Sequence, residues 1–373
     1  MSVLIIIALG VLLQRLSDKL KVPSLLLFLV CGIIIGPSYL NILSPQFLSY
    51  SKELRHIALV IILLRAGLGL SYESLKTVGR PALFMSFIPG VLEGMAIAVM
   101  ATLFLGISFY EGGMLGFIIA AVSPAVVVPM MIKLQDKKLG TDKGIPSLIL
   151  AGASLDDVVA ITIFTVFSGL YLGNSSNLLI SLLLIPLRII IGAALGYGAG
   201  VLFGKFKYSN TIIVLLTALV FSKFELLAVM VLGFGIRFIN KPLSDTINTH
   251  LSKVWYIAQM FLFMLVGASF NPQNAMNSGL IGLVIIFIGL LFRTLGVYIS
   301  LLKTDLNASE RLYCAIAYIP KATVQAAMGG VPLSLGVASG DMILSISVLS
   351  ILVCTPIGAL LMDKSAPKLL NQS

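Results

Sequence analysis

Long apolar segments follow one another along almost the whole chain, and they constrain its fold more than any other feature of the sequence. Of the 373 residues, 58% are hydrophobic and only 11% are charged. A soluble domain usually carries about 25% charged residues, because its surface faces water. A helix needs about 20 mostly apolar residues to cross a bilayer. We therefore expect an all-α polytopic membrane protein in which residues 1–373 form one transmembrane unit.

Thirteen segments are candidates for membrane-spanning helices. They cover residues 3–20, 24–40, 55–71, 81–106, 111–133, 145–170, 177–204, 209–222, 225–239, 252–270, 277–302, 309–335 and 341–362. Most Lys and Arg residues fall on alternate loops, and such loops usually face the cytoplasm. This bias predicts an integral protein of the cell (inner) membrane with its N-terminus outside and its C-terminus cytoplasmic. The net charge of +10 is spread over these loops, so we expect no nucleic-acid partner.

An internal repeat is visible at an offset of about 200 residues. Residues 64–72, LRAGLGLSY, resemble residues 264–272, MLVGASFNP, and residues 30–37, VCGIIIGP, resemble residues 231–238, VLGFGIRF. Both matches pair one span with the seventh span after it, so the two copies would lie in opposite orientations. Inverted-topology repeats of this kind are typical of secondary transporters.

Two spans that this repeat would pair contain proline inside the apolar run. The fifth span contains Pro124 and Pro129, and the twelfth contains Pro320 and Pro332. Proline lacks a backbone donor and disrupts a helix, and transporters with inverted repeats place their sites at interrupted helices. We therefore expect two broken crossing helices and a site between them.

Six polar residues from five spans fall at similar depths, about 14 to 18 Å from the inner end of each span at 1.5 Å per residue. They are Ser123, Asp156, Asp157, Arg293, Glu93 and Lys321. Ionisable groups inside a membrane are costly and usually functional. Consecutive helical residues point about 100° apart, so only one of the adjacent aspartates faces a given neighbour. Carboxylate oxygens suit hard cations, and a proton and a cation can compete for one such group.

The basic residues suggest partners for these carboxylates. Arg293 is the natural partner of one aspartate and keeps its proton in proteins. Lys321, next to Pro320, is placed to compensate the negative C-terminal ends of half-helices, and titration of Lys321 is the alternative. Glu93 is expected to take part in the charge compensation at the broken helices. A structural pair between Arg65 and Glu93 is a further expectation, although Arg65 lies shallower, at roughly 9 Å.

Four segments together resemble the cation/proton antiporter superfamily, and most closely its NHA-type sodium/proton antiporters. They are residues 153–158, ASLDDV, residues 122–129, VSPAVVVP, residues 319–325, IPKATVQ, and residues 63–69, LLRAGLG. The resemblance covers nearly the whole chain. It implies a homodimer of thirteen-helix protomers, with a core that moves against a dimerisation scaffold in an elevator-like cycle. In this chain the core helices would be about 81–170 and 277–362, and the scaffold helices about 1–71 and 177–270.

The resemblance also implies roles for single residues. Asp157 would be the main carrier of the cation, Na+ or Li+, and of the proton, while Asp156 would share this metal site and pair with Arg293. The residues implied to line the site are Ser123, Pro124, Val122 and Ser154. Such a protein is not an enzyme and needs no cofactor, and it serves pH homeostasis by exchanging monovalent cations for protons. Many bacterial relatives carry lysine where Arg293 stands, which leaves the stoichiometry of exchange open.

Other functions are compatible with parts of the pattern. A sodium-coupled symporter of an organic anion is the main alternative, and Lys321 and Gln325 would be its minimal donors for the anion. An intramembrane aspartyl protease is disfavoured, because its two aspartates must come from different helices. A channel would need a ring-forming selectivity motif, which the sequence does not offer.

Overall fold

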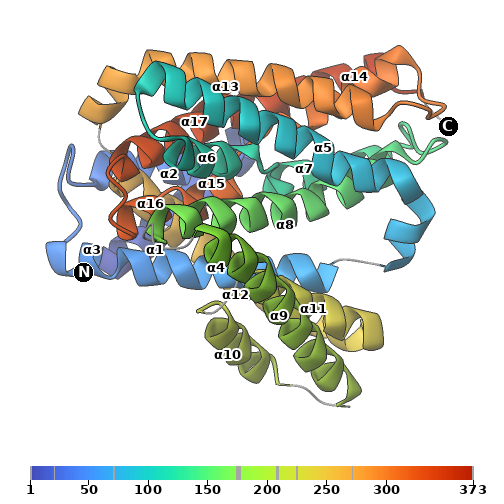
Figure 1. The fold of residues 1–373 in the computed structure, drawn as a ribbon, viewed down its shortest axis with the longest axis horizontal. Helices are drawn as coiled ribbons and strands as arrows, with labels where there is room; N and C mark the ends of the chain where they lie inside the picture. The colour runs from blue at the N-terminus through green and yellow to red at the C-terminus, as the bar shows by residue number, and fades with distance from the viewer. Residues whose placement is uncertain are drawn as a thin grey trace.

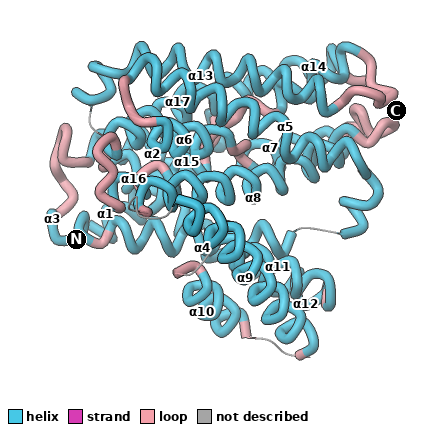
Figure 2. The backbone as a smooth tube through the Cα atoms, viewed as in Figure 1, coloured by secondary structure: helices cyan, strands magenta, loops and turns pink. Residues whose placement is uncertain are grey.

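The protein is almost entirely helical, as Figures 1 and 2 show. The computed structural model describes residues 2–20, 22–69, 72–173, 178–206, 210–223, 226–270 and 272–371. No β-strand is found in these ranges, in agreement with the predicted all-α class. The helices are α1 (Ser2–Leu20), α2 (Ser24–Ile35), α3 (Pro45–Ser49), α4 (Ser51–Gly69), α5 (Tyr72–Leu105), α6 (Phe109–Ala120), α7 (Pro124–Asp136), α8 (Ile145–Leu172), α9 (Leu178–Lys205), α10 (Thr211–Phe221), α11 (Leu226–Ile239), α12 (Lys241–Ala268), α13 (Pro272–Ser300), α14 (Ala308–Ala317), α15 (Thr323–Met328), α16 (Val331–Ser334) and α17 (Gly340–Leu369).

Six helical segments of the described chain are long and apolar enough to cross a bilayer. They are Gly79–Leu105, Phe109–Asp136, Ile145–Leu172, Lys241–Ala268, Gly279–Ser300 and Gly340–Leu369. Shorter apolar helices accompany them, among them α2 and α10. The chain is therefore an integral membrane protein, while the count of thirteen crossings and the orientation of the termini stay predictions.

Two of the expected spans are interrupted in the structure. Each first half-helix begins with a capping box, formed by Ser108 and Glu111 in α6 and by Asn307 and Glu310 in α14. Reciprocal side-chain bonds of this type satisfy the first free amides of a helix. Helix α6 then ends before the break at residues 121–123, and α14 ends before the break at residues 318–322.

The two breaks contact each other through the backbone. The amide nitrogen of Ser123 donates a hydrogen bond of 3.0 Å to the carbonyl oxygen of Pro320. Because irregular backbone at membrane depth must be satisfied by protein or water, each break supplies a partner that the other needs. The sequence prediction of two interrupted helices that meet is confirmed by this bond.

Glycines from the matched segments make two close helix contacts. A Cβ atom on Gly32 of α2 would lie 2.1 Å from the Met264 carbonyl oxygen of α12, and one on Gly67 of α4 would lie 1.9 Å from the Met230 carbonyl oxygen of α11. Small residues allow such close approach of membrane helices. The pairs α2–α12 and α4–α11 are the ones that the proposed repeat would exchange, although the repeat itself stays a prediction.

The helices gather into two groups in Figure 1, in which α9, α10 and α11 lie below a larger group that contains α5, α6, α8, α13 and α17. Helices α4 and α12 run between these groups. The broken helices lie within the larger group, where α6 packs on α5 and α8, and α7 packs on α8. The division into a mobile core and a scaffold stays a prediction.

Candidate functional site

Asp156 is fully buried on α8 and held by two donors. Its Oδ2 atom accepts a hydrogen bond of 2.8 Å from Nη2 of Arg293 on α13 and one of 2.8 Å from the amide of Val122 in the first break. Charge-assisted bonds of this kind are the strong ones in proteins. The side chain of Asp156 is therefore fixed between α13 and the first break.

Glu93 on α5 is the second buried carboxylate of this network. Its Oε2 atom accepts hydrogen bonds from Nη1 of Arg293 and from Nζ of Lys321, the latter at 2.7 Å. The expected pair between Arg65 and Glu93 is wrong. Arg65 lies on α4 and donates instead to Oδ1 of Asn248 on α12, at 3.4 Å, while Lys321 and Arg293 already occupy Glu93.

These four side chains balance in charge. Asp156 and Glu93 carry two negative charges, Arg293 and Lys321 carry two positive charges, and all four side chains are at most 2% exposed. Buried charges are tolerated in proteins when they are paired and hydrogen-bonded. The network is therefore neutral as a whole and leaves no spare cation for the neighbouring Asp157.

Asp157 stands apart from this network although it follows Asp156 directly. It is only 5% exposed, its Oδ1 atom has no hydrogen-bond partner, and no Lys, Arg or His of the described chain lies within 4.0 Å of its carboxylate. An unpaired buried carboxylate is costly. A cation or a proton from outside the protein would remove that cost.

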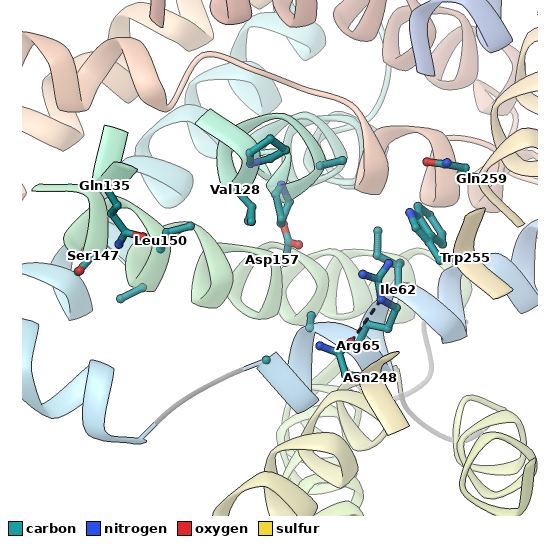
Figure 3. Close-up of a pocket in the computed structure, with 16 residues that line it drawn as sticks. Ile62, Arg65, Val128, Gln135, Ser147, Leu150, Asp157, Asn248, Trp255 and Gln259 are labelled. Atoms are coloured by element: carbon teal, nitrogen blue, oxygen red, sulfur yellow. Dashed lines mark hydrogen bonds between the residues drawn. The ribbon is translucent and has the colours of Figure 1, made fainter. Parts of the chain in front are cut away.

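One face of α8 directs Asp157 into a cavity. Residues Ser147, Leu150 and Asp157 recur at helical spacing along this face and line a cavity of about 580 Å³ (Figure 3). Helices α4, α7 and α12 form its other walls, among them Trp255 of α12 and Val128 of α7. The two adjacent aspartates thus have different surroundings, as their angular separation on a helix requires.

The freed carbonyl groups at the end of α6 are satisfied by side chains from the second broken span and from α13. Nε2 of Gln325 on α15 lies 2.8 to 3.1 Å from three carbonyl oxygens, and Arg293 donates to the Ala120 carbonyl. The three oxygens accepting from Gln325 are those of Ile118, Ile119 and Ala121. Lys321, which we expected to compensate half-helix ends, pairs with Glu93, and its compensating role stays a prediction. The cap by Gln325 was not predicted, because no spacing in the sequence reveals which side chain meets a break.

The residues that the sequence placed at the site lie close together but do not all line the cavity. Pro124 lines it, Val122 uses its amide to hold Asp156, and Ser123 is buried with a hydroxyl that has no partner. The side chain of Ser154 lies outside the described residues. Thr323, at the start of α15, has a second buried hydroxyl without a partner, which sequence reasoning missed.

The chemistry of this region suits a small hard cation. Apart from Nε of Arg293, the buried side-chain atoms of this region that have no hydrogen-bond partner are oxygens, and they include a carboxylate oxygen of Asp157 and the hydroxyls of Ser123 and Thr323. Carboxylate, hydroxyl and carbonyl oxygens are the ligands that hard cations prefer. A site of this kind can exchange a cation for a proton, since both bind the same carboxylate.

Comparison with known proteins agrees with this chemistry. The sequence model of a family described as sodium/hydrogen exchanger, transmembrane, matches residues 4–363. Sodium/hydrogen exchanger 9B2 of Xenopus tropicalis is 33% identical over 96% of this chain and 72% of its own length. The human protein of the same name is 32% identical over 94% of this chain and 70% of its own.

A solved structure shares the fold. The sodium proton antiporter MjNhaP1 from Methanocaldococcus jannaschii superposes with a TM-score of 0.81, over 98% of this chain and 97% of the other, at 22% sequence identity. The resemblance to cation/proton antiporters of the NHA type is thereby confirmed. The chain belongs to the sodium/hydrogen exchanger family.

Proposed function

We propose that this protein exchanges Na+ or Li+ for protons and that Asp157 is the group at which the two compete. The observation that carries the proposal is the position of Asp157: a buried carboxylate with no cationic partner among the described residues, facing a cavity. The names of the relatives, which are sodium/hydrogen exchangers, support the same activity. The cycle needs no cofactor beyond the transported ions.

Asp156 has a different role in this proposal. Its bonds to Arg293 and to the Val122 amide hold it in place, and the guanidinium remains protonated throughout the cycle. Asp156 therefore positions the first break and contributes negative potential to the site, while Asp157 binds and releases the ions. The hydroxyls of Ser123 and Thr323 are the candidate additional ligands.

Alternating access would follow from the position of the cavity. It lies between α7 and α8 on one side and α4 and α12 on the other, which the sequence assigns to core and scaffold. Movement of the core along the scaffold, in an elevator-like cycle, would carry Asp157 from one face of the membrane to the other. Gln135 and Ser147 line the end of the cavity next to a basic loop, so we assign this end to the cytoplasmic face. A homodimer held by the scaffold helices belongs to the same proposal.

The alternative, symport of an organic anion, loses the donors on which it depended. Lys321 is bonded to Glu93, and the amide group of Gln325 is bonded to three carbonyl oxygens. Neither group has a donor facing the cavity, and neither lines it. Exchange of inorganic cations is the function that these contacts favour.

Substitution of Asp157 by Asn tests the proposal. In proteoliposomes, addition of Na+ or Li+ should move protons through the unmodified protein and not through Asp157→Asn, because the amide cannot bind or release a proton. Asp363→Asn is the matched control, since Asp363 is a half-exposed carboxylate on α17 and its loss should leave exchange intact. Cation-dependent proton movement that persists in Asp157→Asn would refute the assignment. A membrane potential measured in the same vesicles would report the stoichiometry.

A further inference from the structure

A positive charge faces the cavity together with Asp157. Among the described residues that line it, only Arg65 and Asp157 carry formal charges, and Figure 3 shows both side chains directed into the same space. A fixed positive charge on the path of a cation is unexpected in a cation exchanger. It calls for an explanation in terms of what the charge does to the site.

Arg65 has no carboxylate partner in the part of the chain that the structure describes. Its one hydrogen bond to a described residue runs from Nε to Oδ1 of Asn248, at 3.4 Å, and its side chain is half-buried. A partly buried guanidinium without an acid carries a desolvation cost that nothing nearby offsets. The carboxylate of Asp157 lines the same cavity.

The other charged groups around Asp157 do not contribute a net charge. They are Asp156 on α8, Glu93 on α5, Arg293 on α13 and Lys321 in the second break. Because their charges cancel, the cavity has a net charge of zero when Asp157 is ionised and of +1 when it binds a proton or Na+. The field of Arg65 therefore opposes the binding of either ion.

We propose that Arg65 is an affinity-setting residue, which weakens the binding of both Na+ and the proton to Asp157 and so promotes their release into this cavity. The inference rests on the proposed function of Asp157. It deepens that proposal, because it assigns to α4 a charge that acts on a carboxylate carried by α8.

The effect of Arg65 on Asp157 is confined to one face of the membrane if α4 and α8 separate during the cycle. Arg65 belongs to a helix of the predicted scaffold, whereas Asp157 belongs to the predicted core. Arg65 would face Asp157 only while the site opens to this cavity. Since both ions carry one positive charge, their affinities fall by the same factor and the exchange equilibrium is unchanged.

Arg65→Gln tests the inference through the pH dependence of the apparent KM for Na+. Removing one charge from a partly hydrated cavity should lower the apparent KM roughly three- to tenfold at alkaline pH, for an effective permittivity of about 20. At acidic pH Asp157 is already protonated, so Na+ has to displace a proton. Arg65→Gln would bind both ions more tightly by the same factor, and the two changes cancel in the apparent KM. The two proteins should then have the same apparent KM.

Matched variants separate charge from packing. Arg65→Lys keeps the charge and should retain the unmodified KM at every pH. Asn248→Asp keeps Arg65 but places a carboxylate at its Nε, so it should reproduce the effect of Arg65→Gln even if that variant folds poorly. Lys253→Gln removes a charge from an exposed position on α12 and should change nothing.

The possible outcomes are distinguishable. An unchanged or raised KM for both Arg65→Gln and Asn248→Asp at alkaline pH would overturn the inference while leaving the function of Asp157 intact, and a shift of equal size at all pH values would do the same. A lowered KM on both faces of oriented vesicles would overturn its restriction to one face. Absence of Na+-dependent proton movement in the unmodified protein would refute the proposed function itself.

Discussion

The balance of the buried network predicts a specific pattern of stability losses. Glu93→Gln removes one of its two negative charges and leaves Arg293 and Lys321 opposite Asp156 alone. Removal of one partner from a buried ion pair typically costs about 3 to 5 kcal/mol, because it leaves a charge without compensation. Lys321→Met should lower the free energy of unfolding by a similar amount, because it leaves the network with a net negative charge where Glu93→Gln leaves a net positive one.

The double variant should be more stable than the two single losses predict together. Glu93→Gln with Lys321→Met restores a neutral network of Arg293 and Asp156. If charge balance is the dominant effect, the loss of unfolding free energy in the double variant is smaller than the sum of the two single losses. The difference should be at least about 1 kcal/mol, as for coupled residues in one network.

The measurement is reversible unfolding of the purified protein in mixed micelles, followed by the loss of helix signal as denaturant rises. Lys133→Met is the control, because its ion pair with Asp363 has side chains that are 47% and 56% exposed and should contribute about 0 to 1 kcal/mol. Additive losses in the double variant, or a loss below about 1 kcal/mol for both single variants, would refute the reasoning.

Two further variants test packing at other points of the structure. Gly67→Ala should destabilise the protein by about 1 to 3 kcal/mol, since its Cβ atom would lie 1.9 Å from the Met230 carbonyl oxygen. Gly69→Ala should not, because no atom of the described residues lies within 4 Å of the added Cβ. Equal unfolding midpoints would contradict the close contact. Gln325→Leu should lower the free energy of unfolding by about 1 to 3 kcal/mol, because the carbonyl groups at the end of α6 lose their donor. Gln46→Leu, on the exposed surface, is the control and should lower it little. A Gln325→Leu protein with unchanged unfolding would show that water replaces the amide.

The sequence allows the charged residues to be found but not all of their partners. The depth of each residue along its span placed Asp156 and Arg293 at one level, because an α-helix has a fixed rise per residue. The same depth estimate placed Glu93 and Lys321 at one level, and that signal would have predicted their ion pair. Arg65 was assigned to Glu93 although it lies shallower, and the structure places it at the cavity instead.

Helix rotation is the part that the sequence did not determine. Between Ile57 and Gly69 the sequence of α4 is apolar apart from Arg65, so this part of the helix has no second polar residue to mark a face, and nothing in the sequence indicates which way α4 turns Arg65. The position of Gln325 is unpredictable for a related reason, since the acceptors at a break depend on where the partner helix crosses. The breaks themselves were predictable, because proline marks them directly.

The bond between Ser123 and Pro320 also limits what mutagenesis can reveal. Donor and acceptor both belong to the backbone, so replacing either side chain by alanine leaves the link in place. A scan of side chains across this region would report the network around Arg293 and miss the connection between the two interrupted spans. Only a change to the peptide group itself, such as an ester at position 123, would expose how much the junction contributes.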